Sequence, residues 1–170
     1  MSEQHGVDHL PKAARRVARL LAEGHYPWQV RLLPDTARSA PEAAAALGCE
    51  VDEIAKSIVF RLDGNGDGAE GDTAVVVVVS GSTRVDESRL VELVGPIGRA
   101  DAAFVKEATG YSIGGVSPFG LVAGARLLVD RSLDGLAQCF CAAGHPHAVV
   151  QTTFAHLLEQ SGHVPIDVTS

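Results

Sequence analysis

The sequence predicts a mixed α+β domain in which short helices and strands alternate without a regular βαβ order. Residues 10–23 repeat apolar side chains at a helical spacing. Residues 75–79 are consecutive valines, which are too β-branched for a preferred helix and typical of a strand buried on both faces. The 170 residues, 46% hydrophobic and 21% charged, suffice for one core. We expect one domain over residues 1–170, with an N-terminal helix at about 10–24 and the core at about 28–168.

The first half of the chain is predicted to alternate between helix and strand. The N-terminal helix ends at Gly24, and residues 28–33 alternate loosely as a strand. Ser39 opens a capping box with a proline in the first turn, which starts an alanine-rich helix that ends at Gly48. Residues 52–62 then form a strand with an apolar run, and the valine strand follows it.

A glycine-rich loop, residues 63–74, joins these two strands. Asp63, Asn65, Asp67 and Gly68 match the first half of a calcium-binding loop. The twelfth position should be a bidentate glutamate but is Ala74, and no helices flank the loop. We therefore expect a flexible hairpin loop rather than a specific calcium site.

The second half continues the mixed pattern. Asp86 is a suitable N-cap for one helix, and Gly110 ends the next. A last helix begins at Thr152 or Thr153 and is closed by Gly162. The remaining segments are expected to be helices at 86–94 and 101–109 and strands at 125–133, 135–144 and 147–153.

Cysteine usage indicates a cytoplasmic protein, and the net charge argues against a protein that coats nucleic acids in general. Cys49, Cys139 and Cys141 are odd in number and lack C-x-x-C spacing, so we expect them to be reduced and structural rather than metal ligands. No signal peptide or membrane span is recognisable. The net charge of −7 opposes broad phosphate binding. The first helix carries a local basic patch, which is either a docking surface or a solvated face. It comprises Lys12, Arg15, Arg16 and Arg19.

Two stretches have the composition of a binding loop. The first, GYSIGGVSPFG at residues 110–120, holds four glycines and a proline, so its backbone can approach a ligand closely. It matches neither a dinucleotide nor a Walker loop, and the spacing around Ser117 is one residue too long for a hydrolase elbow. The second stretch contains His145 and His147, which lack a further metal ligand nearby. Asp130 follows a strand and is expected to act as a turn or cap residue.

Five motifs, in this order, resemble the YbaK and prolyl-tRNA-synthetase-associated editing domain family over about residues 35–160. They are KSIVF at 56–60, VSGSTRVD at 79–86, TGYSIGGVSPFG at 109–120, LLVD at 127–130 and AAG at 142–144. The resemblance implies a curved, partly barrel-like mixed sheet surrounded by short helices. It also implies hydrolysis of the ester between a wrong amino acid and the 3′ end of a tRNA, without metal or cofactor. Prolyl-tRNA synthetase is a candidate partner.

The family's functional residues carry over to positions that match its motifs. Its lysine corresponds to Lys56, and its G-x-x-x-P loop corresponds to residues 114–118. The resemblance thus assigns catalysis to Lys56, Gly114 and Gly115, with water as the nucleophile. The expected substrate-binding residues are Ile58, Phe60, Ser80, Val116, Ser117, Pro118 and His145.

Lys56 is unusual because the chain otherwise prefers arginine. A lysine at a strand end can pack its stem on apolar residues and present a compact charge to a phosphate or an oxyanion. The alternative is a surface lysine paired with Asp52 or Glu53.

Two functions stay open for the protein. One is a deacylase for mischarged tRNA, in particular tRNA(Pro) carrying a small wrong amino acid. The other is a catalytically silent binding or regulatory module of the same fold. A serine hydrolase is disfavoured by the loop spacing.

Overall fold

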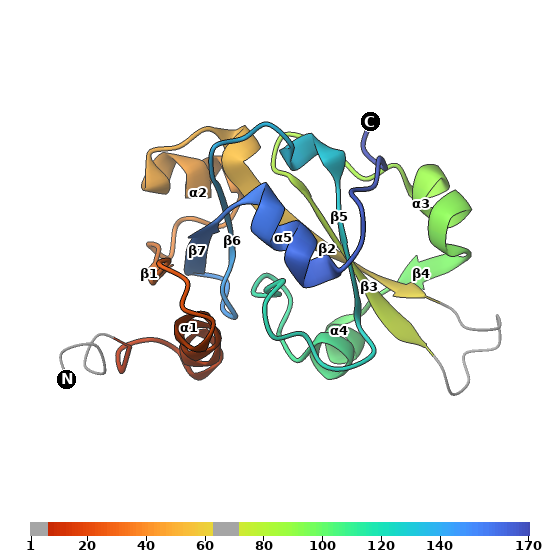
Figure 1. The fold of residues 1–170 in the computed structure, drawn as a ribbon. Helices are drawn as coiled ribbons and strands as arrows, with labels where there is room; N and C mark the ends of the chain where they lie inside the picture. The colour runs from red at the N-terminus through yellow and green to blue at the C-terminus, as the bar shows by residue number, and fades with distance from the viewer. Residues whose placement is uncertain (1–6, 63–71) are drawn as a thin grey trace.

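The computed structural model describes residues 7–62 and 72–170, in which one mixed sheet carries helices on both faces (Figure 1). The strand order is β1-β7-β6-β2-β3-β5, and β4 pairs with β2 off this path. The predicted mixed α+β class is confirmed, and the sheet stays open rather than closing into a barrel. The strands are β1 Val30–Leu32, β2 Ile54–Leu62, β3 Thr73–Ser80, β4 Ile97–Arg99, β5 Arg126–Val129, β6 Cys139–Ala142 and β7 Ala148–Thr152.

Side-chain caps start four of the helices. Ser39 and Asp86 accept hydrogen bonds from the first turns of their helices, as the sequence predicts, and Thr153 rather than Thr152 caps the last helix. None of the helices formed by the described residues is long and apolar enough to cross a bilayer. The helices are α1 Lys12–Glu23, α2 Ala40–Leu47, α3 Glu87–Val94, α4 Ala102–Thr109 and α5 Phe154–Ser161.

Strand β3 lies inside the molecule and is buried on both faces, as the valine run indicates. Val76 and Val78 pack in the larger core cluster, with α1 and the 110–120 loop. The alternate valines, such as Val77, pack with Leu90 of α3 in a second cluster on the opposite face. β2 pairs antiparallel with β3 from Ala55 to Leu62, so it shares both faces.

Three local features differ from the sequence expectation or lie beyond it. The short strand β4 was not anticipated. The strand expected at 125–133 ends at Val129, because the Asp130 carboxylate accepts from the Ser132 N–H and starts a 3₁₀ turn. The same carboxylate accepts from the Val168 N–H and from the Thr169 hydroxyl, so it holds the C-terminal segment. The expected loop and its calcium-like motif fall largely in 63–71, outside the described residues.

Candidate functional site

The middle of β2 has no strand beside it on the edge opposite β3. β6 pairs with β2 only at Ile54 and Ala55, and β4 pairs with it only from Phe60 to Leu62. Within the described parts of the chain, residues 56–59 therefore form an unpaired edge. All four of these residues are half-buried, whereas the directly opposite stretch of β3 is fully buried. The unpaired edge of β2 (residues 56–59) therefore has backbone groups that no neighbouring strand of the described chain binds.

Lys56 lies at the start of this edge, and its charge is not neutralised. Its Nζ donates to the carbonyl oxygen of Thr83 at 2.5 Å and to that of Gly81 at 3.5 Å. The ion pairs among the described residues do not include Lys56, so the expected alternative of pairing with Asp52 or Glu53 is wrong. An ammonium has three donors, so one remains for a ligand.

The environment of Lys56 disfavours the charged form of the lysine side chain. Burial lowers the pKa of Lys56, and the nearby positive charge of Arg84 lowers that pKa further. Neutral carbonyl oxygens orient the ammonium but do not supply the missing negative charge. A half-buried cation in this condition is a suitable binding point for an anionic group.

The hairpin between β6 and β7 continues from the short pairing of β6 with β2, and its tip carries His145. β6 runs parallel to β2 and is paired with it only as far as Cys141, so the tip at 143–147 lies beyond the last paired residues. The glycine loop packs against this tip. A Cβ placed on Gly115 would lie 2.7 Å from the backbone nitrogen of His145, and one on Gly114 would lie 3.4 Å from Pro146. The structure therefore brings the 114–115 loop and His145 together.

The two glycines have different roles in this contact. The Gly115 N–H donates to the Ser112 carbonyl, so this amide closes a turn and is not available to a ligand. Gly115 instead permits close approach of two backbones. Gly114 is exposed, has φ of +87°, and has no recorded partner for its N–H within the described residues. Of the two amides, only the one at Gly114 is without a backbone hydrogen-bond partner among the described residues.

Several of the expected substrate-binding residues are engaged elsewhere. The buried Ser117 hydroxyl accepts from the Phe119 N–H within its own loop. The Ser80 hydroxyl donates to the carbonyl of Asp52. Pro118 is buried in the same loop as Ser117. Ser80 and Ser117 therefore each make a hydrogen bond within the protein, and substrate binding by these three residues stays a prediction.

The apolar residues expected to line one pocket lie in two clusters. Ile58 and Phe60 pack with β3 and α3 on the face that also carries Lys56. Val116 packs in the larger cluster on the opposite face. The three residues do not form one continuous wall, because β2 itself separates them. Sequence reasoning could not show this, since it placed Val116 in a loop without a face.

Ser57 is a candidate that the sequence analysis missed. Its Oγ is buried and has no hydrogen-bond partner, although it lies in the middle of the unpaired edge. A buried hydroxyl without a partner is uncommon in folded proteins. Its only sequence signal was its position next to Lys56.

The ring of His145 is oriented by a local hydrogen bond. Its Nδ1 accepts from the His147 N–H, so a neutral ring carries its proton on Nε2.

The cysteines and histidines do not form a metal site in the described residues. All three cysteines are free, and Cys139 and Cys141 are buried in the larger cluster. Burial raises the pKa of Cys139 to about 12 and that of Cys141 well above its usual range. At neutral pH both are thiols, which are poor nucleophiles and poor metal ligands.

Comparisons with known proteins agree with this arrangement. Bacillus subtilis (strain 168) YwhH, described as uncharacterized, is 33% identical over 129 residues, which cover 75% of this chain and 78% of that protein. A solved structure described as a candidate trans-editing enzyme for prolyl tRNA synthetase is 35% identical, with a TM-score of 0.84 over 95% of this chain and 99% of that one. The hypothetical protein APE2540 is 30% identical, with a TM-score of 0.78 over 91% and 99% of the two chains. The model of the aminoacyl-tRNA editing domain matches residues 34–159. The chain therefore belongs to the aminoacyl-tRNA editing domain family.

Proposed function

We propose that this protein is a free-standing deacylase that hydrolyses the ester between a small, wrong amino acid and the 3′ end of tRNA(Pro). The observation that carries the proposal is the half-buried, un-neutralised ammonium of Lys56 at the unpaired edge of β2. Membership of the editing family supports tRNA as the substrate class. The solved relative assigned to prolyl tRNA synthetase supports proline as the cognate amino acid. Aminoacylated tRNA is formed and used in the cytoplasm, so we propose that the protein acts there.

In the proposed complex, Lys56 binds a phosphate oxygen of the terminal nucleotides. The ammonium is a compact point charge, which suits a single oxygen and needs no bidentate geometry. Its contacts to Gly81 and Thr83 fix its direction before the substrate arrives. Pre-orientation of this kind places the ester without further loss of side-chain entropy.

The chemical step is attack of water on the ester carbonyl carbon. The carbon–oxygen bond to the ribose then breaks, the ribose oxygen takes up a proton, and the free amino acid leaves as its carboxylate. The Gly114 N–H and the Ser57 hydroxyl are the free donors that could stabilise the developing oxyanion. The ribose 2′-hydroxyl of the substrate helps to position the water. The proposed reaction needs no protein nucleophile, and Ser117 is turned into its own loop.

Selection among amino acids would be steric. The 114–115 loop and His145 are in close contact, and we propose that the side chain of the amino acid binds beside this contact, where a bulky side chain would be excluded. Size exclusion of this kind rejects a larger cognate residue more effectively than it distinguishes between small ones. We therefore expect alanyl, cysteinyl or seryl esters to be cleaved and the prolyl ester to be spared.

The test is deacylation of alanyl-, cysteinyl-, seryl- and prolyl-tRNA(Pro) by the purified protein. Lys56→Met keeps the aliphatic stem and removes the charge, and we expect it to lower kcat/KM by about 100-fold. Lys56→Arg is the matched control, because it keeps the charge and should retain part of the activity. A wild-type protein that leaves every mischarged tRNA intact would reject the proposal in favour of a silent binding module.

A further inference from the structure

A groove along α1 gathers positive charge on the surface of this acidic protein. It has a volume of about 1150 Å³ and is formed by α1, the segment before it and the end of α4. Five of the 14 lysines and arginines of the chain line it, against one acidic residue, Asp8. The five cations are Lys12, Arg15, Arg16, Arg19 and Lys106.

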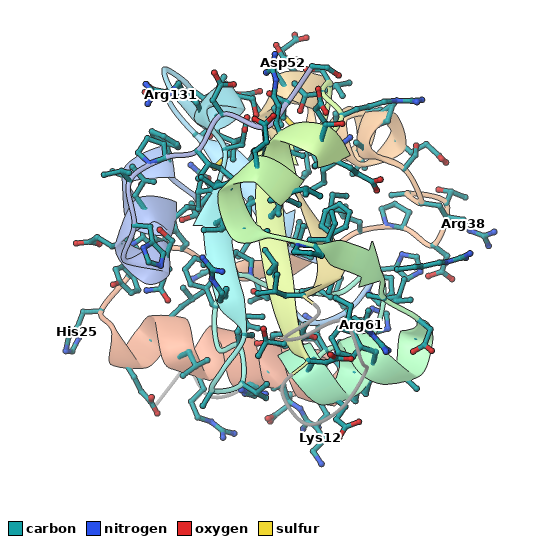
Figure 2. All side chains as sticks on the ribbon, turned by 90° about the vertical axis from the view of Figure 1, so that its right-hand side faces the viewer. Lys12, His25, Arg38, Asp52, Arg61 and Arg131 are labelled. Carbon is teal, nitrogen blue, oxygen red and sulfur yellow. The ribbon has the colours of Figure 1, made fainter. Side chains whose placement is uncertain are left out.

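These cations are arranged along one side of a helix. The four on α1 follow an i, i+3, i+4, i+7 pattern, so they share a face about 10 Å long. None of the five takes part in the ion pairs found among residues 7–62 and 72–170. Figure 2 shows Lys12 directed away from the body of the protein, between α1 and α4. Clustered cations without acidic partners are typical of a surface that binds phosphates.

Arg16 differs from the other cations because it also has a structural contact. Its guanidinium donates to the Gly120 carbonyl and lies over the ring of Tyr111, 5.5 Å from the centroid. It therefore fixes α1 to the 110–120 loop. Arg15 and Arg19 are exposed, and their side chains take part in none of the ion pairs within the described part of the chain, so we expect their charge to be removable without disturbing the fold.

The helix that forms the groove packs against the β6–β7 hairpin of the candidate site. Ala13 lines the groove, and its carbonyl oxygen lies only 2.7 Å from the position of a Cβ on Gly144. Gly144 in turn adjoins His145, whose backbone contacts Gly115. A nucleic acid with its end beside Gly114 would therefore have α1 as a neighbouring element.

We propose that this groove binds the phosphate backbone of the acceptor-stem duplex of the tRNA whose 3′ end occupies the candidate site, an inference that rests on the proposed function. The duplex is the part of a tRNA that directly follows the 3′ end. Its phosphates would face Lys12, Arg15 and Arg19. The contact carries no sequence information, because phosphate contacts position a nucleic acid but do not read its bases.

The test measures binding of an RNA hairpin that carries an acceptor-stem duplex and a single-stranded CCA end, without an amino acid. We compare wild type with Arg15→Gln/Arg19→Gln. The control is Arg38→Gln/Arg131→Gln, which removes the same charge; Figure 2 shows Arg131 at the opposite end of the molecule from Lys12. We expect the groove variant to raise Kd about tenfold or more, and the slope of log K against log[salt] to fall by about 2. The control should stay within about twofold of wild type.

The inference is overturned if the groove variant binds the hairpin as wild type does, or if both variants lose affinity equally. It is also overturned if the wild type binds polyglutamate, a probe for an acidic protein partner, but not the hairpin. Hydrolysis of an alanyl ester of adenosine, which has no stem, separates this inference from the proposed function. Unchanged turnover by the groove variant supports a stem contact. If the wild type hydrolyses no ester but its hairpin binding still depends on Arg15 and Arg19, the proposed deacylase function is rejected. The inference that the groove binds the acceptor stem then still holds.

Discussion

Replacing Gly115 with alanine tests whether the contact between the glycine loop and the β6–β7 hairpin forms the site. The added methyl group would lie 2.7 Å from the His145 nitrogen, 2.8 Å from its Cα and 2.9 Å from the Gly144 carbonyl carbon. All three atoms are backbone, so no side-chain rotation can relieve the contact. Ordinary van der Waals contact begins at 3.4 Å, so the two backbones must separate by about 0.7 Å.

A displacement of this size affects activity more than stability. Overpacking of this kind costs about 1–3 kcal/mol of folding free energy. A misplacement approaching 1 Å in a catalytic arrangement costs about 100-fold in rate. We therefore expect Gly115→Ala to lower kcat/KM for mischarged tRNA by about 10- to 100-fold, while the protein remains folded in a urea titration.

Gly124→Ala is the matched control. Gly124 lies in the segment that follows the same loop, has φ of +99°, and has no atom within 4 Å of an added Cβ. Its substitution introduces backbone strain of about 1 kcal/mol but moves no neighbour. We expect unchanged kcat/KM for this control. Full activity in folded Gly115→Ala would refute the assignment of the loop–hairpin contact to the site.

Three further predictions concern single groups. In protein labelled at lysine Cε with ¹³C, the NMR titration of Lys56, assigned with Lys56→Arg, should have its midpoint below the ordinary pKa of about 10.4. Because the folded pKa is lowered, folding becomes more favourable as pH rises through it, and a midpoint at or above the ordinary value contradicts the burial argument. Asp130→Ala leaves three donors without an acceptor and should lower the free energy of unfolding by about 3–5 kcal/mol, against little change for exposed Asp134→Ala; equal losses would refute the role of Asp130. A maleimide should label Cys49 in the native protein and all three cysteines in denaturant; native labelling of Cys139 would contradict its burial.

The elements that sequence predicts well are those with a local cause. The cap at Ser39 and the left-handed glycine at Gly48 fix both ends of α2, and each follows from adjacent residues. The five valines likewise determine a strand buried on both faces, because β-branched side chains pack well there. β4 has three residues and no pattern of its own, so its existence depends on pairing with β2.

The candidate site was predictable only in part, because its geometry depends on pairing between distant segments. Sequence resemblance assigned Lys56, Gly114 and His145 to the site, and these assignments stay predictions. It could not show that β6 and β4 leave the middle of β2, where Lys56 and Ser57 lie, unpaired on that edge. Nor could it show that β2 divides Ile58 from Val116. These relations are set by strand register, which the sequence does not encode locally.

The three lysines of the chain allow the site and the groove to be tested together. Lys12 and Lys106 line the groove, and Lys56 lies at the unpaired edge of β2. Acetylation by an amine-reactive ester, measured residue by residue by mass spectrometry, therefore reports separately on the two surfaces. A blunt-ended acceptor-stem hairpin should protect Lys12 and Lys106 but not Lys56, because it lacks the single-stranded end. Adding the CCA end should extend protection to Lys56, since its phosphates reach the ammonium. Protection of Lys56 by the blunt hairpin, or none with the CCA end, would contradict the proposed path of the RNA.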